Sequence, residues 1–342
     1  MSYLELRDAI NYRFGKVSFL RPFFEWAQGV DFGYRYLLHR KLNRDVTTAS
    51  TREIFVEWAN YCNLRCSFCA LDHFQPKKRM SLATWERFLQ ELSTDSRFRK
   101  VEVIHLHNGG ETLLHPQFDE MLALLDRYKL QTEQLGSSFP KVEILTNGML
   151  LNEKRRKSIL QCKAIQKVGL SMDGGSPEDF EAIRIRAKWD VFTGHFEALV
   201  RENAEIHSPK KIFLISVFTD EEKLKLRKFH PDFERMLQLA DRSELRLVHD
   251  WGGQVELDGN IQLNQSKWYK WGCNMMMDQL VLLPDGSVSL CCNDLNGKGV
   301  VGNLHKDGLY GAYTSLQRTQ WLDQMAKNKA NQIELCKDCE RF

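Results

Sequence analysis

The sequence predicts an α/β protein with a parallel sheet and covering helices, the sheet being either open or closed into a barrel. Three observations lead to this fold class. Strand-like apolar segments alternate with helix-like segments from about residue 52 to residue 250. Polar or glycine-rich loops follow most of these strands. A chain of 342 residues with 43% hydrophobic residues can bury the core of one large domain or two ordinary ones.

The elements follow one another in a regular order. Residues 1–50 are expected to form one or two amphipathic helices before the alternation begins. Strands are expected where short apolar runs occur, at 52–59, 101–107, 141–146, 165–173, 211–218 and 244–250. Helices are expected between them, at 81–94 with Ser81 as the N-cap, at 116–129, at 152–162, in segments up to about 207, and near 232–241.

Charge and composition exclude some classes of protein. Lysine and arginine number 48 and aspartate and glutamate 45, and the net charge of +3 does not favour a nucleic-acid partner. The chain lacks the run of about 18 apolar residues that a membrane span needs, and residues 1–16 do not resemble a signal peptide. We therefore expect a cytoplasmic protein whose thiols are reduced.

Nine cysteines in a reducing compartment need an explanation other than disulfides. Cys62, Cys66 and Cys69 form one group and residues 273–339 contain a second, whereas Cys162 stands alone as a small core residue. Two groups far apart in sequence indicate two soft-metal sites. The first could be a zinc site with His73 as fourth ligand, or an iron–sulfur cluster in which three thiolates leave one iron open to a small molecule.

The unusual loops are expected to lie at one edge of the sheet. The cysteine triplet follows the first strand, and the loops 108–112, 146–148, 171–175 and 249–253 follow later ones. The carboxyl ends of parallel strands meet on the same side, where α/β proteins build their sites. We therefore expect these loops and the cysteines to form one site.

The C-x3-C-x2-C motif after the first strand and the Gly-Gly-Glu loop after the second resemble the radical S-adenosylmethionine (SAM) superfamily over residues 54 to about 250. The resemblance implies a partial (β/α)6 TIM-like barrel, a cluster on Cys62, Cys66 and Cys69, and cleavage of SAM to a 5′-deoxyadenosyl radical. Thr112 departs from the family, whose loop usually continues with proline, and we expect little effect. By position, the implied SAM contacts are Phe68 at the adenine, Gly109, Gly110 and Glu111 at the amino group, Asn147 and Ser171 near the ribose, and Arg184 or Arg186 at the carboxylate. The alternative for Asn147, Ser171 and the two arginines is a turn-forming or surface role.

The second cysteine group resembles the SPASM/Twitch extension of the same superfamily. Its spacing is C-x17-C-x44-C-x2-C, and a hairpin with a Pro-Asp-Gly turn lies inside it. The resemblance implies one auxiliary [4Fe–4S] cluster on Cys273, Cys291, Cys336 and Cys339; a four-cysteine zinc ribbon is the alternative. The expected division is 1–50 for an N-terminal helical segment, 51–255 for the radical SAM core and 256–342 for the auxiliary domain.

The layout resembles 2-deoxy-scyllo-inosamine dehydrogenase-like enzymes, which implies a small polar substrate such as a sugar or aminocyclitol. Alcohol oxidation is the expected reaction. A radical epimerase with Cys292 as hydrogen donor, a peptide-modifying enzyme and a non-enzymatic zinc scaffold are the alternatives. His249 and Asp250 are candidate catalytic residues, with His107 and Trp251 beside the pocket. The expected cofactors are two [4Fe–4S] clusters and SAM, and the expected reductant is a flavodoxin or ferredoxin.

Overall fold

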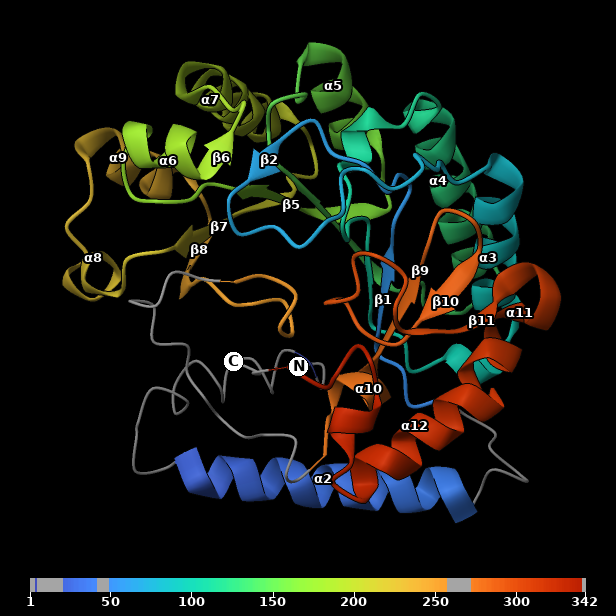
Figure 1. Cartoon of the computed structure of the whole chain (residues 1–342). Coiled ribbons are helices and arrows are strands. Elements are labelled where there is room, and N and C mark those ends of the chain that lie inside the picture. The colour runs from blue at the N-terminus through green and yellow to red at the C-terminus, as the bar shows by residue number, and fades with distance from the viewer. Residues whose placement is uncertain (1–3, 5–20, 42–48, 257–271, 340–342) are drawn as a thin grey trace.

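The computed structural model describes residue 4 and residues 21–41, 49–256 and 272–339. A nine-stranded sheet runs through it in the order β11-β10-β9-β1-β3-β4-β5-β7-β8. Six strands are the predicted ones and run parallel to their neighbours: β1 (Glu53–Val56), β3 (Val103–His105), β4 (Lys141–Thr146), β5 (Ile165–Ser171), β7 (Lys211–Phe218) and β8 (Arg242–Leu247). The predicted α/β class with a partial barrel is confirmed (Figure 1).

The C-terminal strands extend this sheet. β9 (Gln279–Leu282) pairs in parallel with β1, and β10 (Ser287–Ser289) returns antiparallel beside β9 through the predicted turn at 284–286. β11 (Val300–Asn303) lies at the edge. Since β9 joins β1 directly, the second cysteine group is built onto the barrel. The predicted domain boundary near 255 stays a prediction, and it adjoins residues 257–271, outside the described residues.

The helices between the strands match the sequence pattern closely. Ser81 accepts a hydrogen bond from the backbone N–H of Thr84 and caps α3, as predicted. The helices that follow the barrel strands are α3 (Leu82–Thr94), α4 (Phe118–Gln134), α5 (Glu153–Gln161), α6 (Pro177–Ile183), α7 (Trp189–Glu205), α8 (Glu221–Leu226) and α9 (Pro231–Leu239). The C-terminal region contains α10 (Met275–Asp278), α11 (Leu304–Tyr313) and α12 (Leu316–Ala326).

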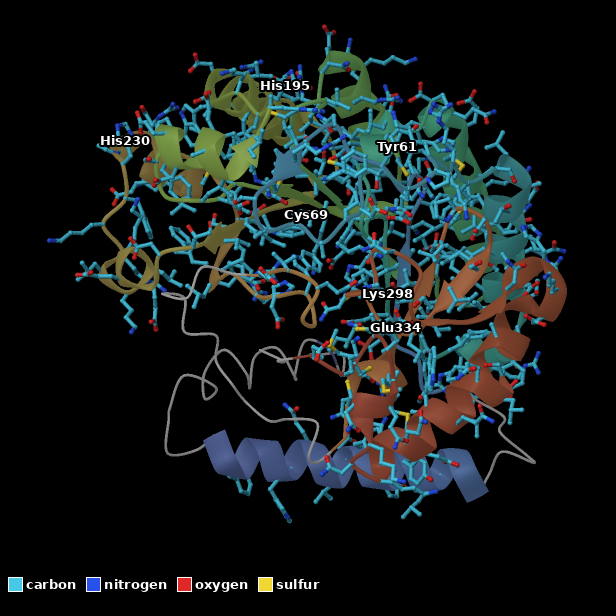
Figure 2. All side chains as sticks on the ribbon, viewed as in Figure 1. Tyr61, Cys69, His195, His230, Lys298 and Glu334 are labelled. Carbon is cyan, nitrogen blue, oxygen red and sulfur yellow. The ribbon has the colours of Figure 1, made fainter. Side chains whose placement is uncertain are left out.

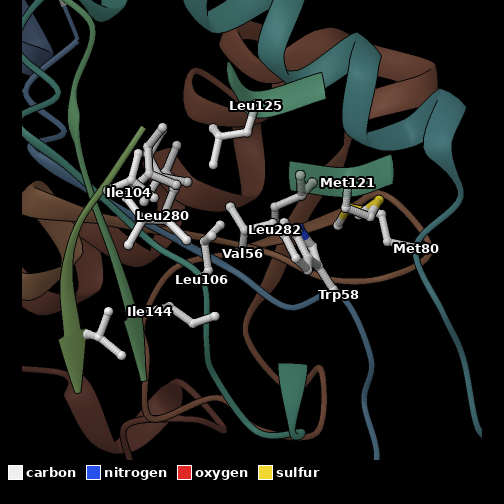
Figure 3. Packing of buried hydrophobic residues seen from close by; sticks show 14 of the residues in the cluster. Val56, Trp58, Met80, Ile104, Leu106, Met121, Leu125, Ile144, Leu280 and Leu282 are labelled. Atoms are coloured by element: carbon white, nitrogen blue, oxygen red, sulfur yellow. The ribbon is translucent and has the colours of Figure 1, made fainter. Parts of the chain in front are cut away.

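The two sides of the sheet differ in chemistry. Side chains alternate across a strand, and Ile54, Val56 and Ile104 are buried against the helices, where Met121 and Leu125 of α4 meet them (Figure 3). Phe55 and His105, one residue along, point to the opposite, interior side of the curved sheet and stack with ring centroids 4.3 Å apart. The interior side is therefore where polar side chains gather.

The N-terminal helix α2 (Arg21–Lys41) agrees with the predicted amphipathic segment, and the rest of residues 1–48, apart from Leu4, lies outside the described residues. Arg35 forms an ion pair of 2.5 Å with Asp278, and the Tyr36 hydroxyl donates to Asp323 at 2.8 Å. These bonds attach α2 to the C-terminal region. Among the described residues we find no helix of the length and apolarity that crossing a bilayer requires.

Candidate active site

The first cysteine group lies on a loop that is held by a short strand pair. β2 (Arg65–Cys66) pairs antiparallel with β6 (Arg184–Ile185), which sets Cys66 opposite Arg184. The backbone N–H of Ser67 donates to Ile183 at 2.9 Å, and that of Cys69 donates to Cys66 at 3.1 Å. All three thiols are partly buried. The loop that carries the C-x3-C-x2-C motif is therefore anchored to β6 and to the residue before it, Ile183.

These thiols need a positive partner to ionise. Burial raises the pKa of the Cys62 thiol to about 12, and the nearby Glu111 carboxylate adds to the effect. Burial raises the pKa of Cys66 to about 11, although the Arg184 cation acts in the opposite direction. A bound iron centre supplies the charge that turns such thiols into thiolate ligands. The donor set thus fits a cationic cluster.

The thiols are not gathered around a single point. Among the described residues, no three or more His, Cys, Asp or Glu side chains are arranged to hold one ion. The zinc alternatives, with His73 at the first site or four cysteines at the second, stay alternatives to the iron–sulfur clusters on this geometry.

The Gly-Gly-Glu loop rests on a carboxylate that the sequence analysis missed. The backbone N–H groups of Gly109 and Gly110 donate to Oε1 of Glu57 at 2.9 and 2.8 Å. A Cβ at Gly110 would lie 1.7 Å from the Ala59 carbonyl oxygen, so only glycine fits there. Burial raises the pKa of Glu57 to about 8. The sequence signal that could have identified Glu57 is its position directly after a buried strand.

Glu111 joins two of the predicted loops. Its Oε1 accepts from the Thr146 hydroxyl at 2.7 Å and its Oε2 from the Asn147 backbone N–H at 2.9 Å. The Asn147 side chain donates to Oδ1 of Asn63 at 2.9 Å and lies 3.6 Å from the Cys62 sulfur. Three residues predicted from separate loops, Cys62, Glu111 and Asn147, therefore lie together. A carboxylate has further lone pairs with which to accept from an ammonium group.

The two candidate arginines have different surroundings. Arg184 is buried, with its Nε 2.7 Å from Oδ2 of the fully buried Asp173. Arg186 is exposed and has a positive φ of 79°. Arg184 lies beside the cysteines, since its cation acts on the pKa of both Cys66 and Cys69. The structure therefore presents Arg184 to the site and Arg186 to solvent.

Phe68 and Ser171 lie on the same side of the barrel mouth. Phe68 is buried with Ile183, Val217 and Val248. Its carbonyl accepts from the Trp251 indole N–H at 2.8 Å, which ties the cysteine loop to the loop after β8. Ser171 ends β5 and is partly buried. The side chain expected at the adenine is thus part of an apolar wall.

The fold brings part of the second cysteine group together. Cys336 and Cys339 share one turn, in which the backbone N–H of Cys339 donates to Cys336 at 3.2 Å. A Cβ at Gly252 would lie 3.6 Å from the Cys339 sulfur, so the loop after β8 lies against this pair. Cys273 and Cys291 are partly buried at the margin of the main hydrophobic core. The assembly of all four into one cluster site stays a prediction.

Comparisons with known protein families agree with this geometry. Residues 56–230, more than half of the chain, match the Radical SAM superfamily, and residues 273–340 match SPASM, an iron–sulfur cluster-binding domain. The chain belongs to the radical SAM superfamily. It has the SPASM extension, and these two domains imply SAM and two [4Fe–4S] clusters as its cofactors.

Two curated relatives of the chain are distant in sequence. The GTP 3′,8-cyclase of Aquifex aeolicus (strain VF5) is 26% identical over 213 residues, which is 60% of this chain and 61% of the relative. The antilisterial bacteriocin subtilosin biosynthesis protein AlbA of Bacillus subtilis (strain 168) is 25% identical over 43% of this chain and 31% of the relative. The chain thus spans less than two thirds of either protein.

Solved structures of radical SAM proteins share the fold. BtrN in complex with AdoMet and 2-DOIA is 19% identical with a TM-score of 0.55, covering 85% of this chain and 93% of BtrN. Streptococcus suis SuiB bound to the precursor peptide SuiA is 15% identical with a TM-score of 0.64, covering 88% and 73%. anSMEcpe with bound AdoMet is 14% identical with a TM-score of 0.61, covering 85% of each chain. At these identities the likeness concerns the fold alone.

The interior of the radical SAM barrel carries a polar row. Phe55, His105, Glu143 and Lys167 are neighbours in register on four adjacent strands. Nδ1 of His105 lies 3.6 Å from Oε2 of Glu143, and Lys167 forms an ion pair with the same carboxylate. The sequence analysis missed these three polar residues because each occupies a short apolar strand.

Two further interior side chains each have a buried polar atom without a hydrogen bond to another described residue, although Nη1 of Arg246 lies 3.6 Å from Oε1 of Glu244. Nδ1 of His107 and Nε of Arg246 are buried, and neither has a hydrogen-bond partner within the described part of the chain. The His107 ring lies edge-on to His105, with centroids 5.4 Å apart. Burial lowers the pKa of His107 to about 3, and the neighbouring His105 and Arg246 add to the effect while Glu143 opposes it. His107 is therefore a neutral imidazole at pH 7.

The three candidate catalytic residues have different surroundings. Cys292 packs against Phe55, Val281 and Leu283 on the interior side, unlike its neighbour Cys291. Asp250 is buried and accepts from the Gly252 backbone N–H at 3.0 Å, and burial raises its pKa. His249 lies against Trp251 with ring centroids 4.5 Å apart, and burial lowers its pKa to about 3. Their catalytic roles stay predictions.

Proposed function

We propose that this radical SAM enzyme oxidises a hydroxyl-bearing carbon of a small polar substrate, of sugar or aminocyclitol type. The observation that carries the proposal is the polar interior of the barrel, where His107 and Arg246 present buried polar atoms with no partner among the described residues. Such groups are costly to bury alone. A hydroxylated ligand in the interior would satisfy them, and no protein segment described here does.

The cofactor residues follow from the two cysteine groups. Cys62, Cys66 and Cys69 would hold the first cluster, and Cys273, Cys291, Cys336 and Cys339 the second. When bound, the first cluster supplies the electron that cleaves SAM, and the second, with four thiolate ligands, can accept a single electron. Arg184 is our choice over Arg186 for the SAM carboxylate, because only Arg184 is turned toward the cysteines. Phe68, Gly109, Gly110, Glu111, Asn147 and Ser171 keep their proposed places around SAM.

The interior residues would orient the substrate hydroxyl. Neutral His107 can accept a hydrogen bond from that hydroxyl at Nδ1, and Arg246 can donate to a substrate oxygen through Nε. Oxidation to a carbonyl releases the hydroxyl proton, and we propose that it passes to water, because a His107 with a pKa of about 3 holds a proton weakly. His105 and Glu143 lie next along the same side of the sheet, and Lys167 is partly exposed beyond them. We propose His107 as the hydrogen-bond acceptor and the other three as its support.

A second function has one specific observation in its favour. Cys292 lies on the interior side against Phe55, so it could donate a hydrogen atom to a substrate radical, as an epimerase requires. Peptide modification is a further alternative, given that the SuiB structure contains a precursor peptide. We also propose a cytoplasmic setting, in which thiols stay reduced and a flavodoxin or ferredoxin supplies electrons.

The test uses anaerobically reconstituted protein with SAM, dithionite and a panel of aminocyclitols and sugars in heavy water. Alcohol oxidation predicts one 5′-deoxyadenosine per carbonyl product, with no solvent deuterium on the reacting carbon. A product of unchanged oxidation state with one solvent deuterium at an inverted carbon would instead identify an epimerase. Cleavage of SAM that no member of the panel stimulates would contradict the proposed substrate class.

A further inference from the structure

The loop between β10 and β11 contacts the segment that follows the first cysteine group. Nδ2 of Asn296 donates to the Ala70 carbonyl at 2.8 Å, and Oδ1 of Asn296 accepts from the Asp72 backbone N–H at 2.9 Å. One amide therefore makes two bonds to a stretch that begins directly after Cys69. The two partners, an acceptor and a donor, also fix the orientation of the amide.

The same loop contacts the Gly-Gly-Glu segment. The Asn108 side chain donates to the Asp294 carbonyl at 2.9 Å. A Cβ at Gly109 would lie 3.2 Å from Cβ of Leu295, so Leu295 packs directly on that glycine. The loop thus forms part of the wall of the proposed SAM site.

A third contact comes from the loop after β8. The Gln254 side chain donates to the Asn293 carbonyl at 2.9 Å. Residues 293–296 therefore touch the loops that follow β1, β3 and β8, all at the carboxyl ends of barrel strands.

A buried carboxylate stiffens this contact loop. Asp294 is fully buried, and its side chain accepts from the Ser289 hydroxyl at 2.6 Å and from the backbone N–H groups of Lys298 and Gly299 at 2.9 and 2.7 Å. Its own backbone N–H donates to the Cys291 carbonyl at 2.9 Å. The backbone N–H of Asn296 also donates to Oδ1 of Asp294 at 3.3 Å, so Cys291 and Asn296 belong to one hydrogen-bonded turn. In Figure 2, Lys298 at the end of this turn is seen between Cys69 and Glu334.

We propose that Asn296 is a positioning residue for the SAM site and that it couples SAM binding to the cluster held at Cys291. Asn296 fixes the segment after Cys69 and the wall beside Gly109 in the arrangement that receives SAM. When the second cluster is present, it holds Cys291 and so holds the loop. The proposal rests on the cysteine assignments proposed above and is independent of the substrate, so the two can fail separately.

The experiment measures the equilibrium dissociation constant of SAM on the reconstituted protein, together with its iron content and the electron paramagnetic resonance signal of the reduced first cluster before and after SAM. Asn296→Ala should raise the dissociation constant about tenfold, which equals about 1.4 kcal/mol, and should reduce the spectral change on adding SAM. Asn296→Asp keeps the acceptor for the Asp72 N–H but sets a carboxylate oxygen against the Ala70 carbonyl, so it should raise the dissociation constant at least as much as Asn296→Ala. Asn331→Ala, an exposed asparagine of the same region, is the matched control and should leave both readouts unchanged.

Coupling is tested by removing the second cluster with Cys336→Ala. Linkage predicts that this variant also weakens SAM binding, and that it adds little further weakening in the Asn296→Ala background, because the connecting contact is already lost. The proposal is overturned if both Asn296 variants, at full iron content, bind SAM within twofold of the unmodified protein. It is also overturned if Cys336→Ala loses half of the iron and still binds SAM within twofold. Equal weakening by Asn331→Ala would overturn it as well.

Discussion

Replacing Glu57 by glutamine tests how the Gly-Gly-Glu loop is supported. Glutamine retains an oxygen that can accept from the backbone N–H groups of Gly109 and Gly110, but it cannot ionise. Burial raises the pKa of Glu57 from 4.5 to about 8. In the folded state this carboxyl therefore keeps its proton over a pH range in which the unfolded chain has lost it.

The sign of the effect follows from this difference. Between pH 4.5 and about 8 the native state binds more protons than the unfolded state, so the free energy of unfolding falls as pH rises through this window. At 1.36 kcal/mol per pKa unit the full loss is about 4 to 5 kcal/mol, as an upper limit. Glu57→Gln should escape that loss. Its stability relative to the unmodified protein should rise steadily from pH 5 to pH 8.5.

Urea unfolding of both proteins at several pH values measures this difference. Glu334→Gln replaces an exposed glutamate, labelled in Figure 2, and is the matched control. At pH 5, Glu57→Ala should be destabilised by about 2 to 5 kcal/mol, since two buried N–H donors lose their acceptor. The reasoning is refuted if the two free energies of unfolding, of Glu57→Gln and of the unmodified protein, differ by a constant amount, within about 0.5 kcal/mol, from pH 5 to pH 8.5.

Three further predictions concern the cofactors. Gly110→Ala should weaken SAM binding at least about 100-fold, roughly 2.8 kcal/mol, because its Cβ would meet the Ala59 carbonyl at 1.7 Å. Equilibrium dialysis measures this binding, and an unchanged dissociation constant would contradict the requirement for glycine at this position. Replacing the three cysteines of the 62–69 loop by alanine should abolish SAM cleavage and leave about half of roughly eight irons per chain; a count near four with zinc in the unmodified protein would favour a zinc ribbon. If the enzyme is a dehydrogenase, Cys291→Ala should form no oxidised product and Cys292→Ala should still form most of it. If Cys292→Ala instead forms 5′-deoxyadenosine without inverted product, the result would support an epimerase.

Local patterns were sufficient for the fold class and for the cluster motifs. The six strands and the capped helix after Ser81 follow from alternation and capping within short windows, and the structure has them where they were expected. The C-x3-C-x2-C motif is local too. Loops after parallel strands meet at one edge of a sheet, and Cys62, Glu111 and Asn147 do lie together.

Choices between neighbouring residues required the tertiary structure. Arg184 and Arg186 have the same chemistry and lie two positions apart, and the β2–β6 pairing buries the first and exposes the second. Cys291 and Cys292 are adjacent, yet one packs at the main core and the other packs against Phe55 on the interior side of the sheet. A sequence pattern has no means of assigning the side on which such residues lie.

The sequence by itself thus determined the α/β alternation, the two cysteine groups and the family, since each depends on residues close together in the chain. Only the tertiary structure decided that Glu57 supports the Gly-Gly-Glu loop, that His105, Glu143 and Lys167 share a row, and that Asn296 bonds to the segment after Cys69. The physical reason is that these contacts join residues separated by up to 226 positions. Burial and hydrogen bonding at such distances are set by the packing of the whole chain and leave no local pattern.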